Sequence, residues 1–518
     1  MSDYTRLEEM LPDDPDEVVR RCMTLLEKDR DDAMALFLIG TVYSRAERYG
    51  YAFSIFKRVH ELKPDRGEPL NNMGMCLSAL GEYGQAREYY QKAWALKRTA
   101  TYAANIGFTF MEMQDHKKAF EWCEKALKLD PDCKPAKSSR GFSKLATGDW
   151  ETGWKDWGVT LGGKFRKQKQ FEDEELWDGT PGKTVVVYGE QGLGDELLYS
   201  SCIPDLTKVA KHVIIDCDSR LKNLLARSFP NASVYGTRRA ETEWVSKHKI
   251  DANCPVGQLP QFFRPSPDSC PGTPYLIADP ERRLQWKALF DSWGTKPKIG
   301  ICWTGGSRHN NPKARTIGLE QFRPLMQAID ADWISLQYKD PTDEIAKTGL
   351  PVRHFRRACE TDDYDDTAAL VAELDFVIGV HTSVNHLTGA LGVPAIILVP
   401  SMTLWMYQVP SQRSFPWYAS AQLFKQNKGE KWSQTITRLV NDTRLRGTID
   451  GWIKLRSRVE QSALGTAGYG RNVSVPDAED HVTDNFAEMA RLSAHTDIPT
   501  VYTSAPYQME RTSSIDAT

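Results

Sequence analysis

Residues 184–195 read Thr-Val-Val-Val-Tyr-Gly-Glu-Gln-Gly-Leu-Gly-Asp, a β-branched run followed by a glycine-rich turn that ends in an aspartate. Consecutive β-branched residues are typical of a strand buried in a parallel sheet. The residues after Asp195 have the pattern of a helix, so the stretch predicts a strand, a turn and a helix. Such a turn lies at the carboxyl edge of the sheet, where doubly wound folds bind their ligands.

The glycine-rich turn supplies the first candidate site residues. Gly192 and Gly194 predict a backbone that a ligand can approach closely. Asp195 has two interpretations, which the residues alone leave open. It is either a helix cap that accepts backbone N–H groups or a carboxylate that acts as a general base.

A second α/β half is predicted downstream. A strand at 298–303 ends in Thr304, and the loop 308–315 carries the cations Lys313 and Arg315. The strand 376–380 leads directly into His381, Thr382 and Ser383 at the start of a helix. Free backbone N–H groups and the positive end of the helix dipole favour phosphate binding there. We expect a loop cation to neutralise a pyrophosphate beside this helix.

Helical repeats precede the α/β region. Small residues recur at spacings of 34, 33 and 34 in two columns, which are Gly40, Gly74, Gly107, Gly141 and Ala52, Ala86, Ala119, Gly153. Small residues at a fixed period allow pairs of helices to cross closely. The pattern over about 33–158 resembles the tetratricopeptide repeat (TPR), with a capping helix expected at 15–29. The concave face of such arrays usually docks a protein.

The turn Glu190–Asp195, after a repeat array and after Trp177-Asp-Gly, resembles the bacterial TPR proteins with a heptosyltransferase-like glycosyltransferase domain. The resemblance implies a GT-B fold, in which two Rossmann-like halves face each other across a cleft. It also implies that Asp195 is the base that deprotonates an acceptor hydroxyl.

The segment 381–391 is similar to the family pattern D-T-x-x-x-H-L-x-G-A-L-G, which implies a catalytic role for His386. His381 departs from this pattern, because the family has aspartate there. The family context R-[TS]-[IL] favours Arg315 over Lys313 as the residue that binds the leaving pyrophosphate.

The predicted fold class is therefore α plus α/β, a TPR solenoid followed by a GT-B pair of Rossmann-like lobes. The expected boundaries are a TPR domain at 1–160, a linker at 161–182, an acceptor-side lobe at 183–290, a nucleotide-sugar lobe at 291–460 and an acidic, partly disordered tail at 461–518.

Composition limits the classes of partner and the compartment. The chain has 66 Lys and Arg against 69 Asp and Glu, so a dedicated nucleic-acid binder is not expected. An acidic N-terminus and no long apolar run predict a cytoplasmic protein without a membrane span. Ten scattered cysteines predict buried thiols. The pair Asp216 and Asp218 spells D-x-D, but it ends a predicted Rossmann strand, so we do not expect it to bind a metal. The resemblance to GT-B enzymes implies that helix dipoles and cations stabilise the leaving group without a metal, and no cofactor is expected besides the nucleotide-diphosphate sugar as co-substrate.

The function that the sequence favours is an inverting glycosyltransferase. It would move a sugar from a nucleotide-diphosphate sugar to a hydroxyl on a protein or glycan docked by the TPR array. Two alternatives stay open, a non-catalytic scaffold of the same fold and an enzyme that glycosylates modified DNA bases. The sequence does not identify the donor sugar, the base of the nucleotide or the acceptor. It also leaves open whether the chain forms a homo-oligomer.

Overall fold

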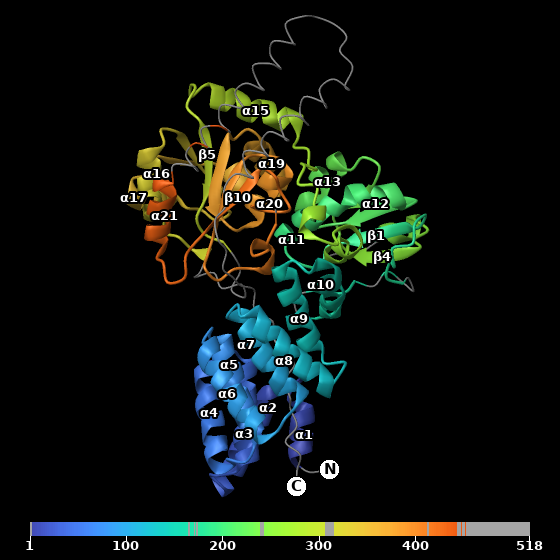
Figure 1. Ribbon diagram of the computed structural model, residues 1–518, viewed down its shortest axis with the longest axis vertical. Helices are drawn as coiled ribbons and strands as arrows, with labels where there is room; N and C mark the ends of the chain where they lie inside the picture. Colours follow the sequence, from blue (N-terminus) through green and yellow to red (C-terminus); the bar gives the residue numbers. More distant parts are fainter. Residues whose placement is uncertain are drawn as a thin grey trace, which may run out of the picture. The chain divides into compact units, whose positions relative to one another are not determined.

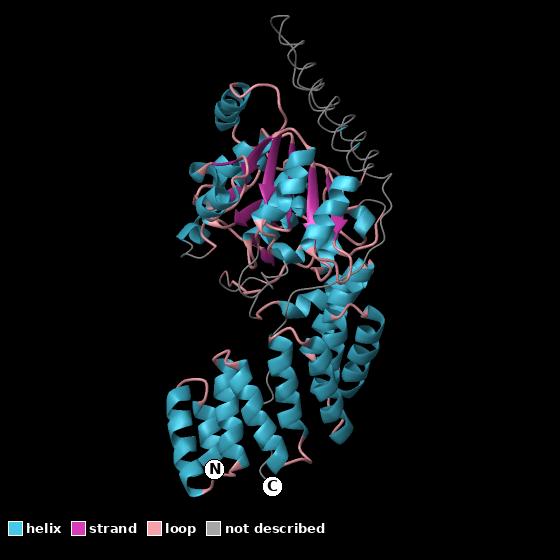
Figure 2. Ribbon diagram, turned by 90° about the vertical axis from the view of Figure 1, so that its left-hand side faces the viewer, coloured by secondary structure: helices cyan, strands magenta, loops and turns pink. Residues whose placement is uncertain are grey.

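In the computed structural model, helices fill the chain before the first strand, and strands appear only after residue 183 (Figures 1 and 2). The structure describes residues 3–442 except 164–165, 170, 172–174, 239–242, 306–314 and 412–413, together with Gly447 and Gly451. The predicted acidic tail therefore lies outside the described residues, as does Lys313.

The N-terminal helices form successive antiparallel pairs. Their bounds are α1 Asp3–Met10, α2 Pro15–Lys28, α3 Ala33–Arg45, α4 Tyr49–Leu62, α5 Gly67–Ala79, α6 Tyr83–Leu96, α7 Ala100–Glu112, α8 His116–Leu129, α9 Lys134–Thr147 and α10 Trp150–Trp157. The capping helix expected at 15–29 is thus α2. Helix α1, which packs Leu7 beside Val18 and Leu38 of α2 and α3, was not predicted.

The two columns of small residues lie where the paired helices cross. A Cβ on Gly40 would come within 2.8 Å of Phe56, and one on Gly74 within 2.6 Å of Tyr90. The same contact distance is 2.9 Å for Gly107 against Cys123. Because real Cβ atoms do not approach so closely, only glycine fits at these crossings. The period read from the sequence is therefore a packing requirement, and the predicted helical array is confirmed.

The first α/β lobe is built on a four-stranded parallel sheet with the order β3-β2-β1-β4. The strands are β1 Thr184–Tyr188, β2 His212–Asp216, β3 Ser233–Tyr235 and β4 Ala252–Pro255. The helices of this lobe are α11 Leu193–Tyr199, α12 Ile203–Val209, α13 Lys222–Ser228 and α14 Pro260–Phe263. The helix that the sequence predicted after Asp195 is thus divided into α11 and α12.

The second lobe holds a six-stranded parallel sheet with the order β10-β9-β8-β5-β6-β7. This is the doubly wound order of a Rossmann fold, and the chain changes direction between β5 and β8. The strands are β5 Lys298–Cys302, β6 Asp332–Ser335, β7 Val352–His354, β8 Phe376–Val380, β9 Ala395–Val399 and β10 Ala421–Lys425. The helices are α15 Pro280–Asp291, α16 Arg323–Ala328, α17 Thr342–Thr348, α18 Arg356–Cys359, α19 Tyr364–Ala372, α20 Ser383–Ala390 and α21 Trp432–Asn441. The predicted fold class, a helical array followed by parallel α/β sheets, is confirmed.

Salt bridges and helix packing join the two lobes. Arg227 of α13 donates to both carboxylate oxygens of Asp365 of α19, each at 2.8 Å. Helix α11 of the first lobe also packs against α20 of the second. The two sheets therefore belong to one compact unit, Gly148–Trp154 with Thr160–Tyr502.

The segment 161–182, which the sequence predicted to be a linker, contributes buried side chains to the first lobe. Arg166 is buried and pairs with Glu190, with Nε and Nη2 at 3.1 and 3.0 Å from Oε1. Lys169 pairs with Asp216 at 2.5 Å, and Phe171 lies in the core beside Tyr188. The polar and glycine-rich composition of the segment indicated a linker. The contacts were not predicted because Arg166 and Lys169 pair with acids that are distant in the sequence.

Helix α10 belongs to both units of the chain. Residues Gly148–Trp154 are part of the α/β unit, whereas Lys155–Val159 are part of the helical unit with Met1–Thr147. The Trp150 ring stacks on Trp417 at 5.3 Å, and the Trp154 and Trp405 rings meet edge to face at 5.4 Å. Trp405 and Trp417 therefore serve packing in the structure. The expected boundary near residue 160 instead falls inside α10.

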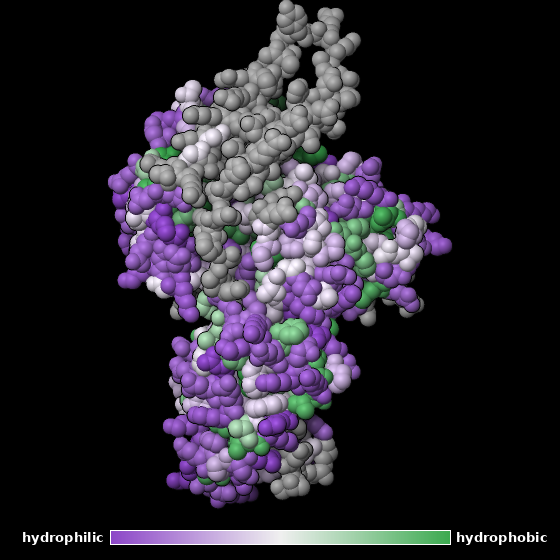
Figure 3. All heavy atoms as spheres, in the orientation of Figure 1, coloured by the Kyte–Doolittle hydropathy of each residue, from purple (hydrophilic) through white to green (hydrophobic). Residues whose placement is uncertain are grey.

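The described surface agrees with the composition. On the face shown in Figure 3, hydrophilic residues predominate over the described helices, and hydrophobic residues form small separate patches. All ten cysteines are buried and free, as predicted. Among the described residues, the helices are too short or too polar to cross a membrane.

Candidate functional site

The candidate residues gather at the points where the two sheets change direction. Asp195 follows β1 in the first lobe, whereas Thr304 follows β5 and His381 follows β8 in the second. Ligands of doubly wound folds bind at this place, outside the carboxyl ends of the strands. Helices α11 and α20 pack against each other there, with Gly194 of α11 close to Ser383, the first residue of α20.

Gly194 makes the close approach of these two helices feasible. A Cβ at this position would lie 3.3 Å from Cδ2 of His386 and 3.3 Å from Cα of Ser383. The sequence predicted that Gly194 opens the backbone to a ligand. In the structure its small size serves the contact between α11 and α20.

Asp195 lies at the third residue of α11, and its carboxylate bonds to the helix's own N-terminus. Its Oδ2 accepts the backbone N–H of Gly192 at 3.0 Å. Burial raises the pKa of Asp195 to about 6, although the Gly192 N–H lowers it in part. The capping interpretation therefore describes one oxygen of Asp195. The raised pKa suits the second interpretation, because a general base works best with a pKa near the working pH.

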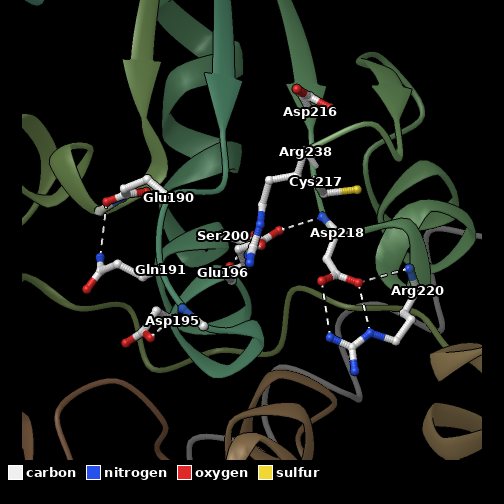
Figure 4. Close-up of polar contacts among 12 residues, drawn as sticks. Glu190, Gln191, Asp195, Glu196, Ser200, Asp216, Cys217, Asp218, Arg220 and Arg238 are labelled. Carbon is white, nitrogen blue, oxygen red and sulfur yellow. Dashed lines mark hydrogen bonds and ion pairs between the residues drawn. The ribbon is translucent and has the colours of Figure 1, made fainter. Parts of the chain in front are cut away.

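The other acidic groups near Asp195 have partners within the first lobe. Glu196 pairs with Arg238 and accepts the backbone N–H of Asp218 at 2.9 Å. Glu190 is held by Arg166 and by the side chain of Gln191. Figure 4 shows Asp195 and Glu196 pointing in different directions from α11. Asp195 alone among these three acids forms no ion pair with the described residues.

Arg315 is the most unusual charged group of the second lobe. It is 8% exposed, and it forms no hydrogen bond or ion pair with the part of the chain that the structure describes. Burial lowers the pKa of Arg315, while Tyr407 and Asp195 act in the opposite direction. A buried guanidinium without a partner is costly in free energy, so it is expected where a ligand supplies the missing anion.

The predicted hydroxyl donors of the second lobe lie at the ends of β5 and β8. Thr304 accepts a hydrogen bond from the side chain of Gln337, whose Oε1 accepts the backbone N–H of Trp303. Thr382 precedes the first residue of α20, and its side chain makes no capping bond. The Ser383 hydroxyl accepts from Tyr364 at 3.3 Å. The helix N-terminus that the sequence assigned to phosphate is present.

His381 is buried and remains neutral. Its Nδ1 lies 3.4 Å from the Thr403 hydroxyl, whereas its Nε2 has no partner among the described residues. Burial, followed by the charge of Arg315, lowers the pKa of His381 well below its usual value. At the position where the family has aspartate, this chain therefore carries an uncharged ring beside a buried cation.

His386 has a tyrosine partner at each ring nitrogen. The Tyr407 hydroxyl lies 3.1 Å from Nε2 and the Tyr418 hydroxyl 3.3 Å from Nδ1. Burial lowers the pKa of His386 to about 4, so the ring is neutral near pH 7. Sequence reasoning missed both tyrosines. Tyr407 lies 21 residues after His386, and nothing in this spacing indicates the contact.

The structure also places the acids of the D-x-D sequence. Asp216 is held by Lys169 and by Thr237, and Asp218 pairs with Arg220 at 2.8 Å. Elsewhere in the second lobe, Asp340, His354 and Glu360 each offer one ligand atom, all within 4.8 Å of one another. The His354 Nε2 is already 2.8 Å from Glu360, so a hydrogen bond accounts for this cluster.

Comparison with known proteins identifies the helical array. The tetratricopeptide repeat family model matches residues 68–99 and 100–133. These ranges contain α5 to α8, so the N-terminal region contains tetratricopeptide repeats.

Individual relatives match different parts of the chain. Protein FlbA of Caulobacter vibrioides is 24% identical over 465 residues, which is 78% of this chain and 77% of FlbA. Among solved structures, MamA is 22% identical over 31% of this chain and 94% of its own, with a TM-score of 0.28. YrrB, described as a TPR protein with an unusual peptide-binding site, is 16% identical over 27% and 73%, with a TM-score of 0.24.

Proposed function

We propose that this chain is an inverting, metal-independent glycosyltransferase that uses a nucleotide-diphosphate sugar. The observation that carries the proposal is a pair of opposite charges at the junction of the lobes. Asp195 comes from the first lobe and Arg315 from the second, and neither forms an ion pair with the described residues. Such a pair provides a base for an acceptor and a cation for a departing phosphate.

Asp195 would act on the acceptor. With a pKa of about 6, its carboxylate is ionised at pH 7 and accepts the proton of an acceptor hydroxyl. The hydroxyl oxygen then forms a bond to the anomeric carbon of the sugar. The bond from that carbon to the phosphate oxygen breaks on the opposite face, which inverts the configuration.

The second lobe would stabilise the leaving group. The electron pair of the broken bond goes to the nucleoside diphosphate, whose negative charge grows as it leaves. Arg315 and the N-terminus of α20, with Thr382, supply positive charge and N–H donors for it. These fixed groups replace the metal ion that other glycosyltransferases use, and His381 adds an uncharged ring beside the phosphates or the sugar.

The helical array would present the acceptor. Repeats of this family are usually protein-docking surfaces, so a protein, or a glycan carried on one, is the expected acceptor. A non-catalytic scaffold would share the array, but it has no use for an unpartnered buried arginine, which lowers stability.

Calorimetric titration tests the proposal with a panel of nucleotide-diphosphate sugars that differ in base and in sugar. We expect at least one to bind the full-length protein. The Arg315→Gln variant should bind it about 10-fold to 100-fold more weakly, since a hydrogen bond to a charged group contributes about 1.5–3 kcal/mol. Arg323→Gln is the matched control, because Arg323 is an exposed cation paired with Glu320.

Two results would contradict the proposal. If no member of the panel binds, the scaffold is favoured. If Arg315→Gln binds as tightly as the wild type, the guanidinium does not hold the phosphates. Salt-dependent affinity for duplex DNA would instead favour an acceptor on a DNA base.

A further inference from the structure

A chain of hydrogen bonds connects the two lobes through His386. The Tyr275 hydroxyl lies 2.7 Å from the Leu197 carbonyl oxygen of α11 and 3.3 Å from the Tyr418 hydroxyl. Tyr418 is in turn 3.3 Å from Nδ1 of His386. The Tyr407 hydroxyl, 3.1 Å from Nε2, completes the chain.

The carbonyl at one end sets the direction of every bond. A carbonyl oxygen only accepts, so Tyr275 donates its single proton to Leu197. The Tyr275 oxygen must then accept from Tyr418, and the Tyr418 oxygen must accept from His386. The proton of the neutral ring is therefore on Nδ1, and Nε2 accepts from Tyr407.

We propose that His386 is a positioning residue held as the neutral Nδ1–H tautomer, and that it fixes Tyr407 as an acceptor-only group beside Arg315. This inference rests on the proposed function for its effect on turnover, but the tautomer follows from the contacts alone. It replaces the catalytic role that the family pattern implied for His386 with a positioning role.

The packing around the ring supports a fixed geometry. A Cβ on Gly389, one helical turn after His386, would lie 2.2 Å from the Tyr418 ring, so only glycine lets this phenol reach Nδ1. The His386 ring is buried, and the neutral form is favoured because burial lowers its pKa to about 4. Both nitrogens are occupied, so neither one is free to exchange a proton with an acceptor or a donor sugar.

The chain also joins the two parts of the proposed site. Leu197 lies on α11, the helix that carries Asp195, and His386 lies on α20, whose N-terminus faces the phosphates in the proposed mechanism. Each bond thus helps to hold the base of one lobe in register with the phosphate site of the other. At its far end the Tyr407 hydroxyl uses its hydrogen to donate to Nε2, so its oxygen can only accept, from a guanidinium or from a ligand hydroxyl.

The tautomer is measured without any substrate. Full-length protein labelled with ¹⁵N-histidine is examined by long-range ¹H–¹⁵N correlation between pH 5.5 and 8, and the His386 signals are assigned as those that His386→Gln removes. We expect a pyrrole-type Nδ1 and a pyridine-type Nε2 at every pH. The opposite tautomer, which free histidine favours, or a ring that becomes protonated in this range would overturn the proposal.

Turnover separates positioning from proton transfer. The probe is the nucleotide sugar that binds in the titration above, and its slow transfer to water is followed as release of nucleoside diphosphate. His386→Gln places an amide oxygen near the position of Nε2, where it still accepts from Tyr407. The His386→Gln variant should keep kcat within about 10-fold of the wild type, with the same pH profile. The His386→Ala variant should raise KM more than His386→Gln does.

A loss of 100-fold or more in kcat for His386→Gln, the size expected for a lost acid or base, would overturn the positioning role. Tyr418→Phe is the second variant, because it removes the acceptor for Nδ1–H and keeps the ring. Without this acceptor, the ring of His386 should no longer be restricted to the Nδ1–H tautomer, so its nitrogen signals should change. Unchanged signals in this variant would equally count against the proposed chain.

Discussion

Buried charged side chains at the carboxyl ends of the two sheets differ in whether they form ion pairs. In the first lobe Glu190, Glu196 and Asp216 are all buried, and each has a cation within the same lobe. In the second lobe Arg315 is buried without an anion, and the Nε2 of His381 has no partner among the described residues. At the end of the first sheet, these three acids are therefore paired with cations and Asp195 is not. At the end of the second sheet, Arg315 has no ion pair with the described residues.

The difference separates structural charges from functional ones. A buried ion pair holds a fold in a particular arrangement, and removing one partner is costly because the other charge is left in a medium of low dielectric constant. An unpaired buried charge has the opposite effect, since its replacement by a neutral group removes a cost. Substitutions of paired and of unpaired buried charges should therefore change the free energy of unfolding with different signs.

The largest effect is expected at Asp195, which forms no ion pair with the described residues. Asp195→Asn keeps the shape of the side chain but removes its ability to accept a proton. Transfer, measured as nucleotide release from a bound nucleotide sugar, should fall by about 10²-fold to 10⁴-fold, while calorimetric affinity for the nucleotide stays near the wild-type value. Asp178→Asn, at an exposed carboxylate paired with Lys183, is the matched control. Unchanged turnover in Asp195→Asn would remove this residue from the mechanism.

The next effect is on stability and contrasts the two buried arginines. Arg166→Met leaves Glu190 unpaired in the core, so the free energy of unfolding should drop by about 3–5 kcal/mol. Arg315→Met removes a desolvated charge that has no partner, so it should leave the free energy of unfolding unchanged or raise it. Urea unfolding followed by fluorescence measures both. A loss of stability in Arg315→Met as large as that in Arg166→Met would mean that Arg315 is a structural residue.

The smallest effect is a pH dependence of stability. The pKa of Asp195 is raised from 3.8 to about 6 in the folded state, so folding favours the protonated carboxyl. Its contribution is fully present below pH 3.8 and is lost as the pH rises through about 6. Asp195→Asn should therefore be more stable than the wild type at pH 7, and this advantage should shrink towards pH 4. Thermal unfolding at a series of pH values checks the sign, and a constant difference would contradict the raised pKa.

The sequence predicted those elements whose local pattern is strong. The β-branched run at 184–188 and the apolar run at 376–380 became β1 and β8, as expected. The pattern was weak for β4, Ala252–Pro255, which contains one asparagine and one proline and no β-branched residue. This strand forms because its backbone pairs with the edge of β1. Such pairing is a tertiary effect, which the β-propensity of the local sequence does not reveal.

The candidate site was predictable in its backbone but not in its contacts. A strand followed by a glycine turn or by Thr-Ser indicated where Asp195 and Thr382 would lie, because strand ends meet at one edge of a parallel sheet. The tyrosines that bind His386 come from segments 21 and 32 residues further along the chain. The cation of Glu190 lies in a segment that composition marked as a linker. Such pairings depend on the folded positions of the helices.

The position of helix α10 limits where the repeat array can be exchanged for another sequence in a gene fusion. Its first turns carry Trp150 and Trp154 into the aromatic cluster of the α/β unit, while its last turn completes the repeats. A gene fusion or a deletion that joins new sequence at residue 161 would strip two tryptophans from the body that holds the site. Exchange of one repeat array for another is therefore expected to leave the aromatic cluster of the α/β unit intact only at breakpoints before Gly148.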